Sequence, residues 1–292
     1  MTSVRLGTVI LPEDPIEQGI ERFRQAEEMG LAHAWTFDHV SWGPLRGRSW
    51  LEAMTFLAAA ASATTSIGIG TLVSSPNHRH PVSLAHQTVT VDHLSRGRFV
   101  LGMGAGAVGP DSNVLGGPAM SGPERAARFE EFAVLTDRLL RGENVTYSGR
   151  FFAAADAWLR PACRQQPRVP FAIAAGGPRG MRLAARLASI WVTIGDGSRP
   201  GQQAERDAFA TLRSQLRRLE DTCVGLSRDP LGLRMLVNAS RIVGDPFSSV
   251  DRWKDLVGRL GELGFTDVVV NQPRSHGVFA GDESAYERAL TS

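Results

Sequence analysis

Short apolar runs alternate with longer helical segments along almost the whole chain, and this rhythm constrains the fold more than any other feature. Runs rich in β-branched residues predict buried strands, and apolar residues at helical spacing predict the helices between them. Such alternation predicts a parallel sheet with helices packed outside it. The predicted strands span residues 4–11, 32–37, 67–73, 98–103, 171–175, 190–194, 233–243 and 267–271, and the predicted helices span residues 16–29, 51–63, 81–94, 122–140, 181–188, 202–223, 250–263 and 284–290.

About eight strand–helix units in a chain of 292 residues favour a TIM-type (β/α)8 barrel over a doubly wound sheet. A doubly wound sheet ordinarily has fewer strands and carries G-x-G-x-x-G in its first turn, whereas that turn here is Leu11-Pro12-Glu13-Asp14-Pro15. The rhythm breaks once, over about 144–170, where glycine, proline and aromatic residues predict an inserted hairpin before strand five. Because no flexible linker divides the chain, we expect a single domain over residues 1–292.

The overall charge and the cysteine content argue against several classes of protein. The formal net charge is only +2, which gives no basis for a surface that binds nucleic acid or a membrane. Cys163 and Cys223 lack metal-ligand spacing and are typical of a reducing compartment, not of a disulfide framework. No apolar stretch is long enough to span a bilayer, and the first residues show no signal-peptide pattern. We therefore expect a cytoplasmic enzyme with a small-molecule substrate.

The segment 171–187 predicts a site for an anion. A short apolar run breaks into Gly176-Gly177-Pro178-Arg179-Gly180 and continues directly into a helix. Glycines let the backbone approach a ligand closely, and the free N–H groups of a helix N-terminus favour negative charge. Arg179 adds a positive charge, so a phosphate is the expected ligand. The same glycines are equally compatible with a strand-to-helix turn that binds nothing.

In a barrel of this type the functional site lies at the carboxyl ends of the strands, and the chemically unusual residues fall there. His39 follows Asp38 after strand two, where a histidine can donate a hydrogen bond or a proton, or can tie two loops together structurally. His78 and His80 have no third ligand nearby in sequence, so we expect no metal. Small residues follow strands three to six, at Ser74-Ser75, 104–107, Gly176-Gly177 and Gly195-Asp196-Gly197. Because small residues leave the backbone accessible, these loops favour a large flat ligand.

Five motifs, in this order and at this spacing, resemble the bacterial luciferase-like flavin and deazaflavin oxidoreductases, particularly the branch that uses coenzyme F420. The resemblance extends from residue 4 to about residue 271. Each motif alone is modest, but together they are specific for the superfamily, and less specific for F420 over FMN. They are Asp38-His39, 70–76 with 79–81, 92–98, 101–106 and 174–178.

The resemblance implies a TIM barrel with an insertion, usually a homodimer, that binds F420 or alternatively FMN. It implies a non-prolyl cis peptide at Leu72-Val73, where the backbone supports the central ring of the deazaflavin. Asp38 and His39 would lie beside the ring system and take part in catalysis. By the same resemblance, cofactor contacts come from Ser75, Gly104, Ala105, Gly106 and Ala107 around the ring and ribityl chain, and from Ala174, Ala175, Gly176, Gly177 and Pro178 at the phosphate, with Arg179 as a further candidate.

One departure bears on the substrate. In the sugar-phosphate dehydrogenase branch, an acidic residue follows the Gly-x-Gly after strand four and a tryptophan follows Asp-His closely, whereas here Ala107 and a displaced Trp42 stand there. The resemblance therefore favours a reductase that passes hydride from C5 of reduced F420 to an ene, imine or carbonyl group. Trp42, Arg46 and Trp50 are expected to shape the substrate pocket, and the general acid would be His39, a loop residue or water. An FMN-dependent monooxygenase and a non-catalytic ligand-binding barrel are the alternatives.

Overall fold

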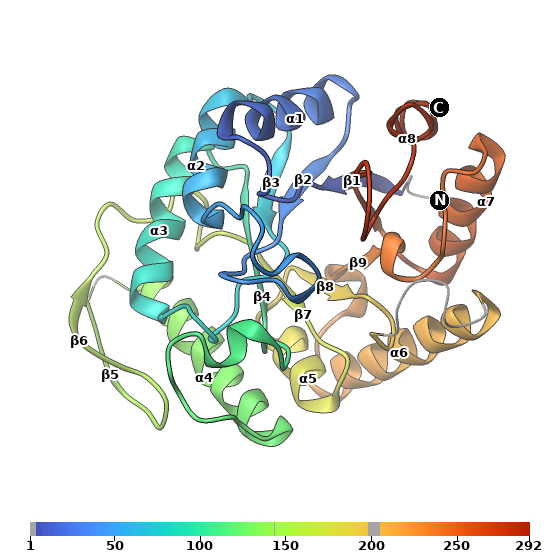
Figure 1. Ribbon diagram of the computed structural model, residues 1–292. Coiled ribbons are helices and arrows are strands. Elements are labelled where there is room, and N and C mark those ends of the chain that lie inside the picture. Colours follow the sequence, from blue (N-terminus) through green and yellow to red (C-terminus); the bar gives the residue numbers. More distant parts are fainter. Residues whose placement is uncertain (1–3, 143, 198–204) are drawn as a thin grey trace.

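Eight parallel strands form a closed barrel at the centre of the protein, and helices surround it (Figure 1). The computed structural model describes residues 4–142, 144–197 and 205–292. The barrel order is β1-β10-β9-β8-β7-β4-β3-β2, and β1 closes the ring by pairing in parallel with both β2 and β10. The predicted TIM-type barrel is therefore confirmed.

The strands and helices alternate as the apolar pattern predicts. The strands are β1 (Arg5–Val9), β2 (His33–Thr36), β3 (Gly68–Thr71), β4 (Phe99–Gly104), β5 (Asn144–Ser148), β6 (Ala153–Trp158), β7 (Phe171–Ala174), β8 (Ile190–Thr193), β9 (Arg234–Asn238) and β10 (Asp267–Asn271). The helices are α1 (Ile16–Glu28), α2 (Ala53–Ala63), α3 (Pro81–Leu94), α4 (Gly122–Arg141), α5 (Pro178–Leu187), α6 (Glu205–Gly225), α7 (Val250–Leu263) and α8 (Glu283–Leu290), with short 3-10 helices η1 (Gly43–Leu45), η2 (Pro110–Asn113), η3 (Pro230–Gly232) and η4 (Ala239–Arg241) in the loops. Among the described residues, no helix has the length and apolar character needed to cross a bilayer.

Most boundaries differ from the prediction by one or two residues, and two larger differences, at the start of α5 and the end of β9, have physical reasons. Helix α5 begins at Pro178 and not at residue 181, because the fixed φ of proline suits the first helical position. Strand β9 ends at Asn238 and not at residue 243, because the chain turns into η4, while Ile242 and Val243 stay buried outside the sheet and prolong the apolar pattern. The predicted helix 202–223 begins outside the described residues, and α6 is described from Glu205.

The segment before the fifth barrel strand is an excursion that contributes no strand to the barrel. β5 and β6 pair with each other in antiparallel fashion, while β4 pairs directly with β7. The hairpin lies outside the ring, beyond α3 and α4 (Figure 1). Glu131 of α4 accepts the backbone N–H groups of Phe151 at 3.0 Å and Phe152 at 2.8 Å, which fastens the hairpin turn to the helix. The insertion therefore lies where the broken rhythm predicts it.

Apolar side chains fill the barrel, because inward-facing positions of parallel strands are shielded from water on every side. Trp35, Ile190, Leu236 and Val269 are each at most 1% exposed there. A second, larger apolar layer packs between the strands and the surrounding helices. The interior is thus a solid core, and any ligand site has to lie at one end of the barrel. The interior cluster consists of Val9, Leu11, Trp35, Phe37, Leu45, Leu72, Ala172, Ile190, Val192, Leu236 and Val269.

A buried network around Asp267 closes the amino ends of the strands. The carboxylate of Asp267 accepts the Nε2–H of His33 at 2.9 Å and is paired with Arg5 at 3.2 Å and with Arg234. Nδ1 of His33 accepts the indole N–H of Trp35 at 2.8 Å, which fixes the proton on Nε2. Because polar side chains seal this end, the opposite end of the barrel is left for ligands.

Glu27 provides a test of the fold that depends on pH. Its carboxylate accepts the backbone N–H groups of Thr65 and Ile67, both at 2.9 Å, and of Ser66 at 2.5 Å, and so anchors α1 to the entry of β3. Burial alone would raise the pKa of Glu27, but the hydrogen bonds with these N–H groups outweigh it and lower the pKa to about 2. We expect Glu27→Gln to lower the free energy of unfolding by about 1 kcal/mol at neutral pH, measured by urea denaturation.

The pH dependence of this effect follows from the lowered pKa. A carboxylate whose pKa is lower in the folded state stabilises the fold above its usual pKa of about 4, and this contribution is lost as the pH falls. The difference between the native protein and Glu27→Gln should therefore shrink between about pH 4 and pH 2. Glu28→Gln, at an exposed neighbouring position, is the control and should have little effect at any pH. A difference that stays constant with pH would contradict this role of Glu27.

Candidate functional site

A cavity of about 550 Å³ opens at the carboxyl ends of the barrel strands. Its walls come from the residues that follow β2, β3, β4, β7, β8 and β9, so loops from most of the barrel converge on it. A cavity of this size and position is typical of a cofactor or small-molecule site. The predicted site residues that line it are His39, Trp42, Leu72, Val73, Ser75, Gly104, Ala105, Gly106, Ala107, Ala174, Ala175 and Gly176.

His39 lies in the wall of this cavity, and a carboxylate holds its ring. Nδ1 of His39 is 2.6 Å from Oδ2 of Asp111, and Oδ1 of Asp111 accepts the backbone N–H of Ser41 at 2.6 Å. Burial alone would raise the pKa of Asp111, but the hydrogen bonds with His39 and Ser41 lower it, so this carboxylate is charged at neutral pH. A charged Asp111 keeps the Nδ1 proton of His39 in place. Nε2 of His39 is thereby left for a ligand, and the side chain is 31% exposed.

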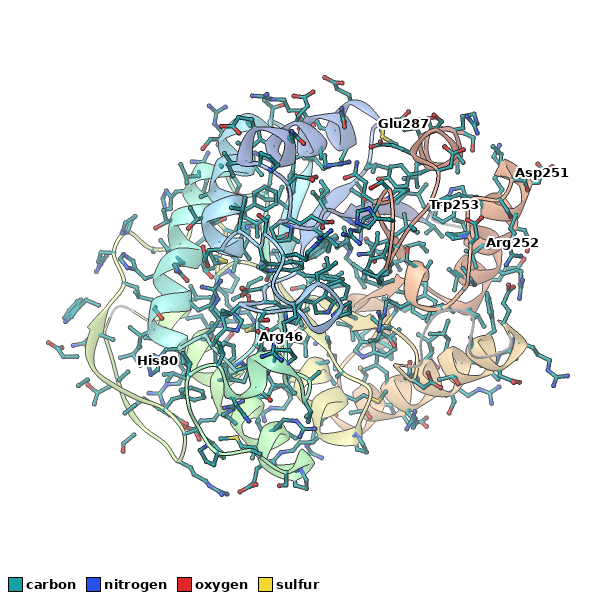
Figure 2. All side chains as sticks on the ribbon, in the orientation of Figure 1. Arg46, His80, Asp251, Arg252, Trp253 and Glu287 are labelled. Carbon is teal, nitrogen blue, oxygen red and sulfur yellow. The ribbon has the colours of Figure 1, made fainter. Side chains whose placement is uncertain are left out.

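Aromatic rings surround the imidazole of His39. Trp42 stacks on it with ring centroids 6.3 Å apart, and Phe37 and Trp50 approach it edge-on. Trp50 packs against Trp42 at 5.9 Å but is not among the lining residues. Arg46 is exposed and lies on the loop that crosses in front of the barrel (Figure 2). Of the three predicted substrate residues, only Trp42 reaches the cavity.

Asp38 is buried behind the cavity wall and does not line it. Its carboxylate accepts the hydroxyl of Ser74 at 2.5 Å, two guanidinium N–H groups of Arg79 at 2.9 and 2.6 Å, and lies 3.2 Å from Nε2 of His78. Burial alone would raise the pKa of Asp38, but the hydrogen bonds with His78 and Arg79 hold it well below its usual range. Asp38 is therefore a permanently charged anchor that ties the end of β2 to the chain after β3. Its contacts are those of a positioning residue.

Bare backbone forms one wall of the cavity. The peptide bond Leu72-Val73 is cis, as the family resemblance implied. A Cβ atom at Gly104 would lie 2.6 Å from Cγ2 of Val73, so only glycine lets β4 approach this peptide. Gly106 has φ of +75°, and a Cβ atom there would lie 2.6 Å from the side chain of Asn77. The glycines after strand four thus serve close approach of the backbone, which keeps this wall flat.

The amino end of α5 opens near the same cavity. Gly177 is its N-cap residue and receives no side-chain hydrogen bond, and a Cβ atom built there meets no atom within 4 Å. Gly177 and Pro178 lie just beyond the residues that line the cavity. Arg179 is not among the lining residues either, and its Nε donates to Glu130 at 2.8 Å. The open N–H groups of the helix are therefore available to an anion, whereas the charge of Arg179 is already paired.

Sequence reasoning missed several lining residues, among them Phe37, Asn77, Asp111, Asn238 and Arg241. Asn238 and Arg241 stand at the carboxyl end of β9, where functional residues of such barrels lie. They were missed because the predicted strand extended to residue 243 and so placed both of them inside the strand. Asn77 donates to the carbonyl of Ala107 at 3.3 Å and accepts from Arg128 at 2.6 Å. No local pattern connects Asp111 with His39.

Comparison with known proteins identifies the family. The family model described as luciferase-like monooxygenase matches residues 1–261. An F420-dependent glucose-6-phosphate dehydrogenase of Microbacterium testaceum is 28% identical, over 85% of this chain and 85% of its own. A 4-hydroxyprotoasukamycin monooxygenase of Streptomyces nodosus subsp. asukaensis is 31% identical over 70% of this chain, which spans 56% of that relative's length.

The fold has close counterparts among solved structures. An F420-dependent secondary alcohol dehydrogenase, in complex with an F420-acetone adduct, superposes with a TM-score of 0.80 over 99% of this chain and 97% of its own, at 17% identity. At that identity the likeness concerns the fold alone, whereas the family model rests on the sequence itself. Because that model matches most of the 292 residues, the chain belongs to the luciferase-like monooxygenase family and is an enzyme of that family.

Proposed function

We propose that this enzyme is an F420-dependent reductase, which transfers hydride to an ene, imine or carbonyl group of a small organic substrate. The observation that carries the proposal is the hydrogen-bonded pair of His39 and Asp111 in the wall of a cavity whose other lining residues are mostly small or apolar. A reduction of this kind adds a hydride and a proton to the substrate. The pair is suited to deliver the proton, and the cavity is suited to a flat cofactor.

The residues of the cavity fit a deazaflavin cofactor. Leu72, Val73 and Ser75 would face one side of the ring system, and the backbone from Gly104 to Ala107 would lie along the ring and ribityl chain. The phosphate would lie at the open amino end of α5, beyond Ala174, Ala175 and Gly176. When bound in its reduced form, F420 supplies the hydride at C5.

The protein's own part in the reaction is orientation, exclusion of water and movement of a proton. Asp111 fixes the ring of His39 through Nδ1, and its negative charge would stabilise the imidazolium form of His39. In that form Nε2–H would donate its proton to the substrate atom that becomes electron-rich, and His39 would be left as the neutral imidazole with its proton on Nδ1. Trp42 and Phe37 shield this position with apolar surface. Asp38 keeps the chain after β3 in register through Ser74 and Arg79.

An FMN-dependent monooxygenase is the second candidate. The 31%-identical relative named as a monooxygenase favours it, because the same barrel serves both chemistries in this family. Reduced FMN reacts with O₂, whereas a deazaflavin, with carbon in place of N5, does not do so readily. The choice of cofactor therefore decides the class of reaction.

Binding of the two cofactors tests the proposal directly. We expect anaerobic titration to show submicromolar affinity for reduced F420 and an affinity for reduced FMN at least about tenfold weaker, a difference of about 1.4 kcal/mol. Isothermal titration calorimetry measures both. Tight binding of FMN with none of F420 would favour the monooxygenase, and binding of neither would contradict both candidates.

A variant at the phosphate site forms the second arm of this experiment. Gly177→Val places a branched side chain in the open space before α5 and should weaken F420 binding about tenfold or more, since it blocks the backbone N–H groups. Gly232→Val is the matched control, because that glycine also has open space around it but lies in η3, away from the cavity. If Gly177→Val binds F420 with unchanged affinity, the phosphate does not bind at the amino end of α5.

Two further expectations remain proposals: a homodimer, which the family resemblance implies, and a cytoplasmic location, which the cysteine content favours. Both cysteines are free and buried, which is compatible with the second expectation. Analytical ultracentrifugation of the purified protein measures the first.

A further inference from the structure

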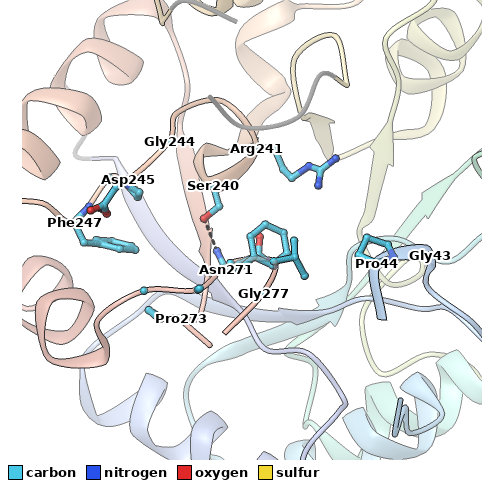
Figure 3. A pocket seen from close by; sticks show the side chains of 15 residues that line it. Gly43, Pro44, Ser240, Arg241, Gly244, Asp245, Phe247, Asn271, Pro273 and Gly277 are labelled. Atoms are coloured by element: carbon cyan, nitrogen blue, oxygen red, sulfur yellow. Dashed lines mark hydrogen bonds between the residues drawn. The ribbon is translucent and has the colours of Figure 1, made fainter. Parts of the chain in front are cut away.

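A second cavity, of about 820 Å³ (Figure 3), shares lining residues with the first one. Gly43, Pro44 and Arg241 line both cavities. Phe279, in the wall of the second cavity, stacks on Trp42 with ring centroids 5.9 Å apart and an angle of 9°, and Trp42 in turn stacks on His39. An aromatic surface thus runs from the second cavity to His39. The other apolar lining residues of the second cavity include Pro246, Phe247, Pro273 and Val278.

Arg241 stands at the boundary of the two cavities as a partly buried cation. It is the last residue of η4, directly after β9, and so lies at the carboxyl end of a barrel strand. Among the described residues, none forms a hydrogen bond or an ion pair with its guanidinium group. Burial lowers the pKa of Arg241, and no carboxylate in the described part of the chain opposes this effect.

Arg274 and Arg79 lie near the same end of the barrel and are largely buried, and each is paired with a carboxylate, unlike Arg241. Arg274 donates to both carboxylate oxygens of Glu13, and Arg79 donates to Asp38. Asp245 lines the second cavity, but its carboxylate accepts the backbone N–H of Phe247 at 2.9 Å, and its side chain points away from Arg241 (Figure 3). Buried charges are normally paired because desolvation is costly, so an unpaired cation facing a cavity indicates a ligand of opposite charge.

We infer that Arg241 binds an anionic oxygen group of the substrate, a carboxylate or a phosphate, while the apolar part of the substrate lies in the second cavity. The planar fork of a guanidinium group matches two oxygens of such an anion. The aromatic surface through Phe279 and Trp42 then extends from the anchored end toward His39. This inference rests on the proposed function, since it assigns the substrate class of the same site.

The test compares a carboxylic acid with its neutral counterpart. Phenylbutanoate and phenylbutanamide differ in charge but hardly in shape, and calorimetry measures the binding of each to the F420-loaded protein. We expect the native protein to bind the acid about tenfold more tightly than the amide, and Arg241→Gln to lose this preference. Arg217→Gln, at an exposed position on α6 outside both cavities, should keep it. Equal binding of acid and amide by the native protein, together with no binding of phenyl phosphate, would overturn the inference.

Separate measurements distinguish this inference from the proposed function. Phenyl phosphate is titrated in parallel. If only phenyl phosphate binds, and Arg241→Gln abolishes this binding, the anion is a phosphate. If only the acid binds, the anion is a carboxylate. If F420 does not bind but the native protein still prefers the acid, the proposed cofactor is wrong and the role of Arg241 stands. If F420 binds and neither anion is preferred over the amide, the proposed cofactor stands and the role of Arg241 is wrong.

Thermal unfolding distinguishes a ligand-binding arginine from one that stabilises the fold. If Arg241 stabilised the fold, removing its charge would lower the midpoint of unfolding. Arg241→Met keeps the length of the side chain and removes an unpaired, partly buried charge. We expect its midpoint of unfolding to rise by about 2 °C or more. A lower midpoint would mean that the guanidinium group stabilises the fold, and that result would contradict its assignment to a ligand.

Discussion

Replacing His39 with alanine is expected to lower turnover by about a hundredfold or more while changing the affinity for F420 by no more than about threefold. The reason is the division of labour in the site. In the imidazolium form of His39, Nε2–H is the group free to give a proton to the substrate, because Nδ1–H is bound to Asp111. The flat wall that would receive the cofactor is built instead from Leu72, Val73 and the backbone after β4. The measurement is the rate at which reduced F420 is oxidised with a panel of cyclic enones, imines and ketones.

Two further variants sharpen this test. Asp111→Asn keeps the size of the side chain but removes the charge that holds the ring, so turnover should fall less than in His39→Ala, by about tenfold. His86→Ala is the control, since His86 is exposed on α3 and does not line the cavity. Unchanged turnover in His39→Ala would exclude His39 as the proton donor. A parallel loss of turnover and F420 affinity would make it a binding residue instead.

The fold was predictable because its main determinants are local. Alternating apolar runs and helical periodicity fix the elements, and connections between parallel strands leave few arrangements for about eight of them. The error at β9 has the same origin: Ile242 and Val243 are apolar and β-branched like a strand, yet they are buried by packing outside the sheet. The local pattern of apolar residues indicates which residues are buried, but it does not distinguish a buried strand from a buried turn.

A residue of the candidate site was predictable only where its place directly after a barrel strand is enough to bring it to the cavity. His39 and the glycines after strand four belong to this class, and they line the cavity. Asp111 and Arg179 do not, because their partners come from distant segments: Asp111 reaches His39 from the loop after β4, and Glu130 of α4 takes the charge of Arg179. Such pairings depend on how loops and helices pack, which no sequence spacing encodes.

Replacing Asp38 with alanine is expected to lower the free energy of unfolding by about 3 kcal/mol or more. The substitution leaves Arg79 and His78 buried without the carboxylate that they share, and frees Ser74 from the end of β2. Arg79 retains an ion pair with Glu52, whose side chain is 44% exposed and therefore offsets little of the loss. Urea denaturation measures the change. In a double-mutant cycle with Arg79→Ala, the combined loss should be smaller than the sum of the two single losses.

The isosteric variant Asp38→Asn separates a positioning role from a direct part in the chemistry. Because the native pKa of Asp38 is lowered, its charge stabilises the fold above the usual carboxyl pKa of about 4, and this advantage over asparagine should fade as the pH drops below that value. If Asp38 positions the chain after β3, Asp38→Asn loses stability at neutral pH, and its turnover recovers at temperatures where it remains folded. If turnover is lost while the free energy of unfolding is unchanged, Asp38 acts in the reaction itself, as the family resemblance implied.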